Sequence, residues 1–272
     1  MKPDKLSTTI ELTNSCLYFI SDFLVINYVV TKIGESMKKI TKKNKKITIT
    51  DGYNPELVAD AFFAGKLEFP IIEKCCVDTL PKTLLPISKI EKSENPNEEF
   101  IHFYENDSNF IDFMNNIEAN SCQLGKFAGI ISSDSSVYWD SPLIVQLANI
   151  YRNHQTAYYL HKINKIVVPN IRWGDERTYT DCIISNEIPA FIGYPKHSVV
   201  AVGNYGCYQS KEEKYHFNNG LKAMIKELEP TLVIVYGSIK NEIFKELSGL
   251  TKFVEYNDWI SIVKRRRFNG NK

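Results

Sequence analysis

The sequence predicts an α/β protein in which parallel strands are surrounded by helices. From residue 99 onward, short β-branched and apolar runs alternate with longer stretches that have helical spacing. The runs are nearly continuous in apolar residues, which is typical of strands covered on both faces. Roughly six such strands, with two or three before them, are about enough for a TIM-like barrel. We expect a barrel-like sheet, complete or incomplete, and keep an open doubly wound sheet as the alternative.

The first part of the chain has a mixed pattern. Residues 1–46 are expected to be mainly helical, and the β-branched run Ile47–Thr50 ends at a turn signal and predicts a strand. Pro55 near the start and Gly65 as a stop predict a helix over roughly residues 54–64.

Strands and helices alternate in the region that follows. Short apolar runs at 67–72 and 83–87 precede a polar stretch at 89–99, which is the best candidate for an internal boundary. The later predicted strands are 100–104, 128–132, 165–168, 198–202, 232–236 and 253–256. The predicted helices are 107–119, 141–163, 178–186, 211–228 and 240–248. The expected parts of the chain are an N-terminal extension (1–66), an α/β core domain (67–259) and a basic C-terminal tail (260–272).

The composition is that of an ordinary globular protein. The 272 residues are 43% hydrophobic, 24% charged and 12% aromatic, which excludes a disordered chain, a collagen-like fibre and a disulfide scaffold. The 33 Lys and Arg nearly balance the 32 Asp and Glu, so no global field draws the protein onto nucleic acid.

Positive charge is concentrated in two blocks, Lys38–Lys46 and the tail residues Lys264, Arg265, Arg266 and Arg267. Such blocks are typical of solvated surfaces and frayed ends. The alternative is contact with nucleic-acid phosphates, which supplies affinity without sequence specificity.

The cysteine pattern and the start of the chain indicate a cytoplasmic protein. The six cysteines form no Cys-x-x-Cys pair, and no histidine lies at zinc-ligand spacing from one of them, so we expect reduced thiols and no metal site. The N-terminus lacks the pattern of an export signal, and the apolar stretch Cys16–Val30 is too short and too polar to span a bilayer. We expect no interaction with a membrane.

The residues that follow each predicted strand are the best candidates for function. The carboxyl ends of parallel strands meet at one rim, where α/β proteins bind their ligands. Many residues there are also ordinary turn formers. The candidates at this rim are Asp134, Asn170, Arg172, Trp173, Asp175, Arg177, Asn204 and Tyr236.

Arginine usage strengthens the argument for part of this rim. Outside the tail, the only arginines are Arg152, Arg172 and Arg177. The planar arginine fork suits a carboxylate or a phosphate. We expect at least one of the three to bind an anionic group or to orient a rim carboxylate, with a structural ion pair as the alternative.

The helix predicted from residue 141 carries Gln146, Asn149 and Asn153 at helical spacing on one face. Asn149 and the nearby Arg152 are candidate ligand-binding residues. The alternative for the amide row is an ordinary solvated face.

Several strong motifs are absent. The chain has no P-loop sequence, no Gly-x-Gly-x-x-Gly, no Gly-x-Ser-x-Gly elbow and no His-Glu-x-x-His. The sequence therefore leaves open whether the protein is an enzyme.

The combined string of several segments resembles a domain-of-unknown-function family. These segments are His102–Asp107, Ser133–Pro142, Gln146–Asn153, Val168–Arg177, Leu228–Pro230 and Val235–Gly237. That family is common in phages, prophages and other bacterial mobile elements, and the resemblance covers roughly residues 67–258. It implies a mobile-element setting and a shared polar rim, and it brings no established activity.

Three functions follow as hypotheses. The first is binding or processing of an anionic small molecule, either phosphorylated or nucleotide-like. In it, Asp134 and Asp175 are acid/base or weak Mg²⁺-binding carboxylates, Arg172 and Arg177 are anion clamps, and Trp173 is a stacking surface. The second is a nucleic-acid-binding accessory protein that uses the basic blocks. The third is a phage protein that binds a host factor.

Overall fold

The computed structural model describes residues 53–163 and 166–270, with side chains as far as residue 264, and these residues belong to one compact unit. The helix expected over 1–46, the strand expected over Ile47–Thr50 and the basic block Lys38–Lys46 lie outside the described residues.

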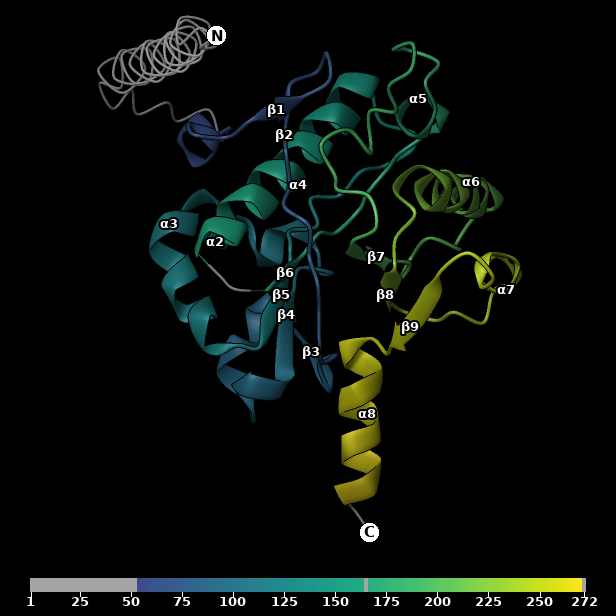
Figure 1. Cartoon of the computed structure of the whole chain (residues 1–272). Helices are drawn as coiled ribbons and strands as arrows, with labels where there is room; N and C mark the ends of the chain where they lie inside the picture. Colours follow the sequence, from purple (N-terminus) through teal and green to yellow (C-terminus); the bar gives the residue numbers. More distant parts are fainter. Residues whose placement is uncertain (1–52, 164–165, 271–272) are drawn as a thin grey trace, which may run out of the picture. The chain divides into compact units, whose positions relative to one another are not determined.

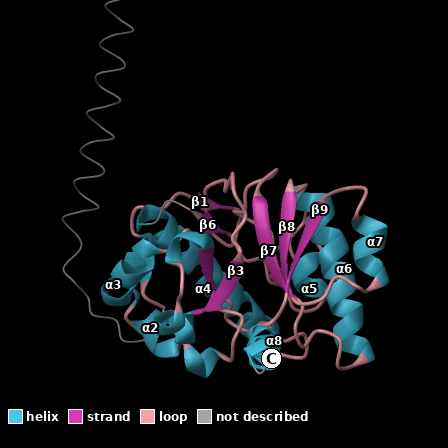
Figure 2. Ribbon diagram, turned by 90° about the horizontal axis from the view of Figure 1, so that it is seen from below, coloured by secondary structure: helices cyan, strands magenta, loops and turns pink. Residues whose placement is uncertain are grey.

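The central strands of the described part form two parallel sheets. The first contains β3 (Thr83–Pro86), β4 (Glu99–His102), β5 (Gly129–Ile131) and β6 (Val167–Val168), and the second contains β7 (Val199–Gly203), β8 (Leu232–Tyr236) and β9 (Lys252–Tyr256). A parallel bridge between Asn170 and Ala201 links the chain after β6 to β7. Across both sheets the strand order therefore follows the chain order. Figure 1 labels the strands of both sheets, and Figure 2 shows β7, β8 and β9 side by side in this order.

Alternate residues along these strands serve different hydrophobic clusters. One set packs together between the strands and includes Phe100, Ile131, Val168, Ala201 and Ile234. Their chain neighbours Ile101 and Val200 pack in the clusters that contain the helices. Because both faces are buried, the strands are made almost entirely of apolar residues, which is why they are visible in the sequence.

The parallel α/β architecture is confirmed, but a TIM-like barrel is not shown, because no ladder joins β9 to β3 among the described residues. The two outer strands are connected instead by a side-chain hydrogen bond. The hydroxyl of Tyr256, at the end of β9, donates to the carbonyl of Pro81, just before β3, at 2.7 Å. The strand order also lacks the reversal that defines a doubly wound sheet.

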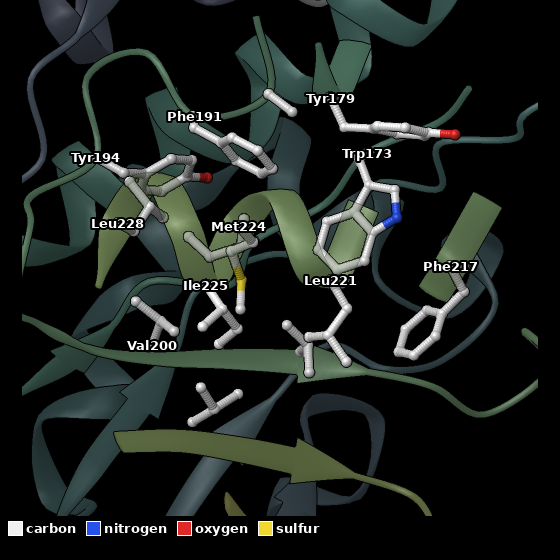
Figure 3. Packing of buried hydrophobic residues seen from close by; sticks show 14 of the residues in the cluster. Trp173, Tyr179, Phe191, Tyr194, Val200, Phe217, Leu221, Met224, Ile225 and Leu228 are labelled. Atoms are coloured by element: carbon white, nitrogen blue, oxygen red, sulfur yellow. The ribbon is translucent and has the colours of Figure 1, made fainter. Parts of the chain in front are cut away.

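The helices cover the outer faces of the strands (Figure 1). They are α2 (Ile111–Asn115), α3 (Ile117–Asn120), α4 (Leu143–Ile163), α5 (Glu176–Tyr179), α6 (Lys211–Leu228), α7 (Glu242–Leu247) and α8 (Trp259–Gly270). Helix α6 begins with a capping box between Ser210 and Glu213. Its apolar face, with Leu221 and Met224, packs between Val200 of β7 and the Trp173 indole (Figure 3).

Three predicted helices differ from the structure. The helix expected over 54–64 is wrong, since only a short 3₁₀ helix (Pro55–Val58) forms before the antiparallel pair β1 (Phe63–Ala64) and β2 (Phe69–Pro70). Gly65 has φ 67°, a left-handed conformation that turns the chain between these strands.

The helix expected over 178–186 is wrong beyond its first residues, because α5 ends at Tyr179 and Thr180 is extended. The helix expected over 107–119 is divided into a 3₁₀ turn, α2 and α3. Asn116, between α2 and α3, has non-helical φ and ψ angles of −126° and 37°.

No helix within the described ranges combines the length and the apolar character needed to cross a membrane.

The packing of α6 against Trp173 yields a stability prediction. A Cβ at Gly220 would lie 2.1 Å from the indole nitrogen of Trp173, which is closer than any real contact. Gly220→Ala should therefore lower the free energy of unfolding by about 2 kcal/mol, despite the better helix propensity of alanine. Urea denaturation measures this change. The control Gly125→Ala, whose Cβ meets nothing within 4 Å, should not be destabilised.

Candidate functional site

A cleft of about 700 Å³ lies at the carboxyl ends of the strands. Every central strand contributes a residue at or just after its end, and these residues include Pro86, Tyr104, Asp134, Arg172, Gly203, Tyr236 and Trp259. Parallel strands joined by crossovers deliver their trailing loops to one edge, so residues far apart in the chain meet here.

A buried ion pair lies on the wall of this cleft. Arg172 donates from Nε to Oδ1 of Asp134 and from Nη2 to Oδ2, and its Nη1 donates to the carbonyl of Gly203 at 3.1 Å. The Asp134 side chain is 6% exposed and that of Arg172 is 21% exposed. Burial lowers the pKa of Arg172, but the charge of Asp134 outweighs this and holds it above its ordinary value. The arginine fork thus orients a rim carboxylate, and it joins the ends of β5 and β7.

Asn170 extends this pair into a network. Its Nδ2 donates to Asp134 Oδ1 at 2.8 Å and to the Ser133 carbonyl at 2.9 Å, while its Oδ1 accepts from the Tyr104 hydroxyl at 2.9 Å. The side chain is fully buried and does not line the cleft. Asn170 therefore positions Asp134 and Tyr104 from beneath, rather than offering a free group to a ligand.

The ring of Tyr104 stacks on Tyr236, with centroids 5.0 Å apart and an angle of 16° between the planes. A Cβ at position 203 would lie 2.6 Å from the Tyr104 ring, so only glycine fits there. The hydroxyl of Tyr236 accepts from the backbone N–H of Trp259 at 3.0 Å, and burial raises the pKa of Tyr236 to about 12. Both rings line the cleft.

His102 is fully buried beside these rings, 4.4 Å from Tyr236 between centroids. Its Nδ1 accepts from the backbone N–H of Tyr104 at 3.0 Å, and its Nε2 has no hydrogen-bond partner among the described residues. Burial lowers the pKa of His102 to about 3, so the imidazole is neutral.

The amide row on α4 is not a solvated face. Asn153 is 1% exposed; it accepts from the backbone N–H of Ser135 at 2.7 Å and donates to the Ser135 carbonyl at 3.1 Å. Asn149, half-buried, donates to the carbonyl of Ser136 at 2.7 Å. The two amides hold the loop that carries Asp134. Asn149 thus has a defined backbone partner and does not line the cleft.

Gln146 ties the same helix to the loop after β6. Its Nε2 donates to Asp175 Oδ2 at 2.8 Å, and its Oε1 accepts from the Asp175 N–H at 3.0 Å. Asp175 also caps α5 by accepting from the backbone N–H of Arg177 at 2.9 Å. Burial raises the pKa of Asp175, but the hydrogen bonds from Arg177 and Gln146 bring it below its ordinary value.

Asp175 and Arg177 therefore pair with each other, outside the cleft-lining residues. The expectation that Asp134 and Asp175 share a site is not met, since only Asp134 lines the cleft. Within the described ranges, no group of three or more His, Cys, Asp or Glu side chains could hold a metal ion.

Trp173 and Asn204 have mainly packing contacts. The Trp173 indole lines the cleft, but it is 8% exposed, packs on Phe217 and donates from Nε1 to the His216 carbonyl (Figure 3). Asn204 donates to the Ser238 carbonyl at 2.6 Å and ties two rim loops together. Neither residue presents a free stacking face or a free amide.

Two further candidates, Arg152 and Lys264, are not among the residues that line the cleft. The guanidinium of Arg152 is 5.3 Å from the centre of the Tyr53 ring. In the basic tail, α8 contains residues 264–267, and Lys264 is exposed; the side chains of Arg265, Arg266 and Arg267 lie outside the described ones.

The sequence reasoning missed the exposed rings of the cleft. Tyr138 and Tyr205 line it and are each 64% exposed. Trp139, which is half-buried, also lines it and stacks on His216 with ring centroids 5.3 Å apart. Large exposed aromatic side chains on a cavity wall are a signal of binding. Tyr205 lies just after a predicted strand, and Tyr138 and Trp139 lie in the segment Ser133–Pro142 that carries the family resemblance, so these were the sequence signals that could have identified them.

Comparison with known proteins supplies a family. Residues 63–257 match the model described as Domain of unknown function (DUF4417). The Gene 1 protein of Mycobacterium phage L5 is 25% identical over 158 residues, which are 58% of this chain and 66% of that protein. The Gene 1 protein of Mycobacterium phage D29 is 24% identical over 140 residues, which are 52% of this chain and 49% of that protein.

The chain thus spans less than two thirds of the length of either relative, and neither name states an activity. No solved structure matches the chain significantly. The matches confirm the resemblance to a phage family of unknown function that the sequence indicated.

The two arginine–aspartate pairs provide a matched test of the fork geometry. Arg172→Lys keeps the charge but cannot satisfy both oxygens of buried Asp134 and the Gly203 carbonyl, so it should lower the free energy of unfolding by about 2 kcal/mol or more. Arg177 is 42% exposed and Asp175 keeps its hydrogen bonds with Gln146, so Arg177→Lys should cause a much smaller loss. Urea denaturation measures the free energy of unfolding of both variants. Equal stability of the two variants would contradict the role assigned to Arg172.

The buried His102 predicts a loss of stability in acid. Its folded pKa of about 3 lies below the ordinary value of 6.5, so the unfolded chain takes up a proton that the folded protein cannot hold. Stability should fall as the pH drops below about 6.5, by up to about 1.4 kcal/mol per pH unit from this group. His102→Asn keeps an acceptor for the Tyr104 N–H and should show a shallower decline in urea unfolding between about pH 7 and 5. An unchanged slope would contradict the assignment.

Proposed function

This chain belongs to the Domain of unknown function (DUF4417) family, and from the geometry of its cleft we propose that it binds a nucleotide-like ligand there. The ligand's planar ring stacks on the exposed tyrosines, and its polar groups bond to the wall. The observation that supports this proposal most directly is that Tyr138 and Tyr205, each 64% exposed, line the same cavity as the buried Arg172–Asp134 pair.

The size and the composition of the cleft support a small molecule. Its volume of about 700 Å³ lies within the usual range for ligand pockets, which are largely apolar with a few fixed polar groups. Stacking on an aromatic side chain contributes about 1–3 kcal/mol per base. The network around Arg172 supplies the fixed polar groups, because its donors are held in place by Asp134 and Gly203.

The ring, rather than a phosphate, is the main recognition element in this proposal. Arg172 is the only Lys or Arg among the described residues that line the cleft, and Asp134 already engages two edges of its fork. Asp134 accepts from Arg172 and Asn170, so its role is to orient the guanidinium. The proposal is therefore binding, and it assigns no proton transfer to Asp134 or Asp175.

A barrel-like, incomplete sheet is the finer architecture that we propose for this binding domain. Three features support it: a strand order without reversal, a residue cluster drawn from all the strands, and the hydrogen bond from Tyr256 in β9 to Pro81 just before β3. In such a sheet all the strand ends surround one mouth, which is where the cleft lies.

Removal of the exposed rings tests the function. Tyr138→Ala and Tyr205→Ala should each weaken nucleoside binding by about tenfold, which corresponds to about 1.4 kcal/mol, without loss of stability. Isothermal titration with adenosine, guanosine, cytidine and uridine measures the affinity. Phe62→Ala removes an 82% exposed ring outside the cleft and serves as the matched control.

Absence of binding by all four nucleosides and their monophosphates would sink the proposal. Binding of a single-stranded oligonucleotide that weakens steeply with salt and disappears on deletion of residues 264–272 would support the accessory-protein alternative instead. Retention of a host protein on the intact chain, unaffected by either tyrosine substitution, would support the host-factor alternative.

A further inference from the structure

We infer that the cleft selects a ring that carries a positive charge, such as an N-methylated nucleobase, over the neutral or phosphorylated form. This inference rests on the proposed function, because it specifies the class of ligand for the same cleft. Its basis is the set of charged side chains that line the cleft. Most of these are negative, although the chain as a whole is nearly neutral.

Five carboxylates line the cleft in the described part of the chain, against one guanidinium. They are Glu105, Asp134, Asp140, Glu213 and Asp258, and the guanidinium is that of Arg172. Asp134 is neutralised by Arg172, so the positive charge is already used. Four negative charges remain.

Three of the four remaining carboxylates, Glu105, Glu213 and Asp258, are held in place by neutral donors. Both oxygens of Glu105 accept from Ser88, at 2.5 and 3.1 Å, and both oxygens of Asp258 accept from Ser261, at 2.6 and 2.9 Å. Glu213 accepts from the backbone N–H groups of Gln209 and Ser210, which directly precede α6. Among the described residues, none of these carboxylates has an ion-pair partner. The positions of Glu105, Glu213 and Asp258 are therefore set, and no described Lys or Arg side chain pairs with their charges.

Such a wall repels a phosphate and attracts a cation. Carboxylates that surround a partly desolvated cavity create a negative potential there, which raises the local concentration of cations. A ring cation gains twice, because it also stacks on the exposed rings of Tyr138 and Tyr205 through the cation–π interaction. A neutral base gains only the stacking, and a nucleoside monophosphate adds like-charge repulsion.

Matched nucleosides test the charge preference directly. The probes are two pairs, 7-methylguanosine with guanosine and 1-methyladenosine with adenosine. The titrations are made at about pH 6, where both methylated rings are cationic. GMP and AMP are the anionic ligands for comparison. In at least one pair the methylated nucleoside should bind about three- to tenfold more tightly than its parent, and the monophosphate most weakly. Isothermal titration gives each affinity.

The double variant Glu105→Gln, Asp258→Asn assigns the preference to the wall. It keeps the size of both side chains and removes two charges, so the ratio of affinities should fall toward one. Glu118→Gln, at an exposed position outside the cleft, should leave the ratio unchanged.

The outcomes separate the two levels of the proposal. If no nucleoside binds, the proposed function fails and the charge preference fails with it. If nucleosides bind but the neutral parent binds as tightly as the cation in both pairs, the proposed function stands and the preference is overturned. A preference that survives in the double variant also overturns it, because the carboxylates would not be its cause.

Discussion

The buried pair of Arg172 and Asp134 organises the rim. A charged group removed from water must be paired and hydrogen-bonded, since an uncompensated buried charge costs several kcal/mol. Here the guanidinium bonds to a carboxylate after β5 and to the Gly203 carbonyl at the end of β7, while Asn170 bonds to the same carboxylate from below. The loops of several strands are therefore fixed relative to one another by one set of contacts. The cleft exists because those loops cannot relax independently.

Helix α4 supports this arrangement from outside the sheet. A helix face that holds Gln146, Asn153 and His154 in the interior is unusual, and each side chain is satisfied by backbone groups or by Asp175. Buried amides suit this task, because one side chain both donates and accepts and can hold a loop that has no regular backbone pairing. The loop after β5 is thereby presented at the cleft without being part of a sheet.

Charge is distributed unevenly although the chain is nearly neutral. Its formal net charge is +1, yet the described wall of the cleft is acidic and the tail is basic. Overall charge governs solubility and long-range attraction, whereas recognition depends on the few charges that face a ligand. For this reason the global balance did not reveal the character of the site. The arginine count led us to expect either an anion site or the orientation of a rim carboxylate, and the contacts of Arg172 are those of the second.

Much of the architecture could be read from local pattern. The strand Leu232–Tyr236 and the helix Lys211–Leu228 have the predicted bounds, because continuous apolar runs and amphipathic spacing reflect burial that repeats along the chain. The location of the rim followed as well, since parallel crossovers leave little choice of where loops converge. The partners of many side chains could not be read, because they come from other segments of the chain. The pairing of Asp175 with Gln146, the burial of the amide row and the exposure of Tyr138 depend on how α4 packs on the loops. Local propensity specifies which elements form, whereas the meeting of side chains from separate segments is set by packing, which no short window of sequence contains.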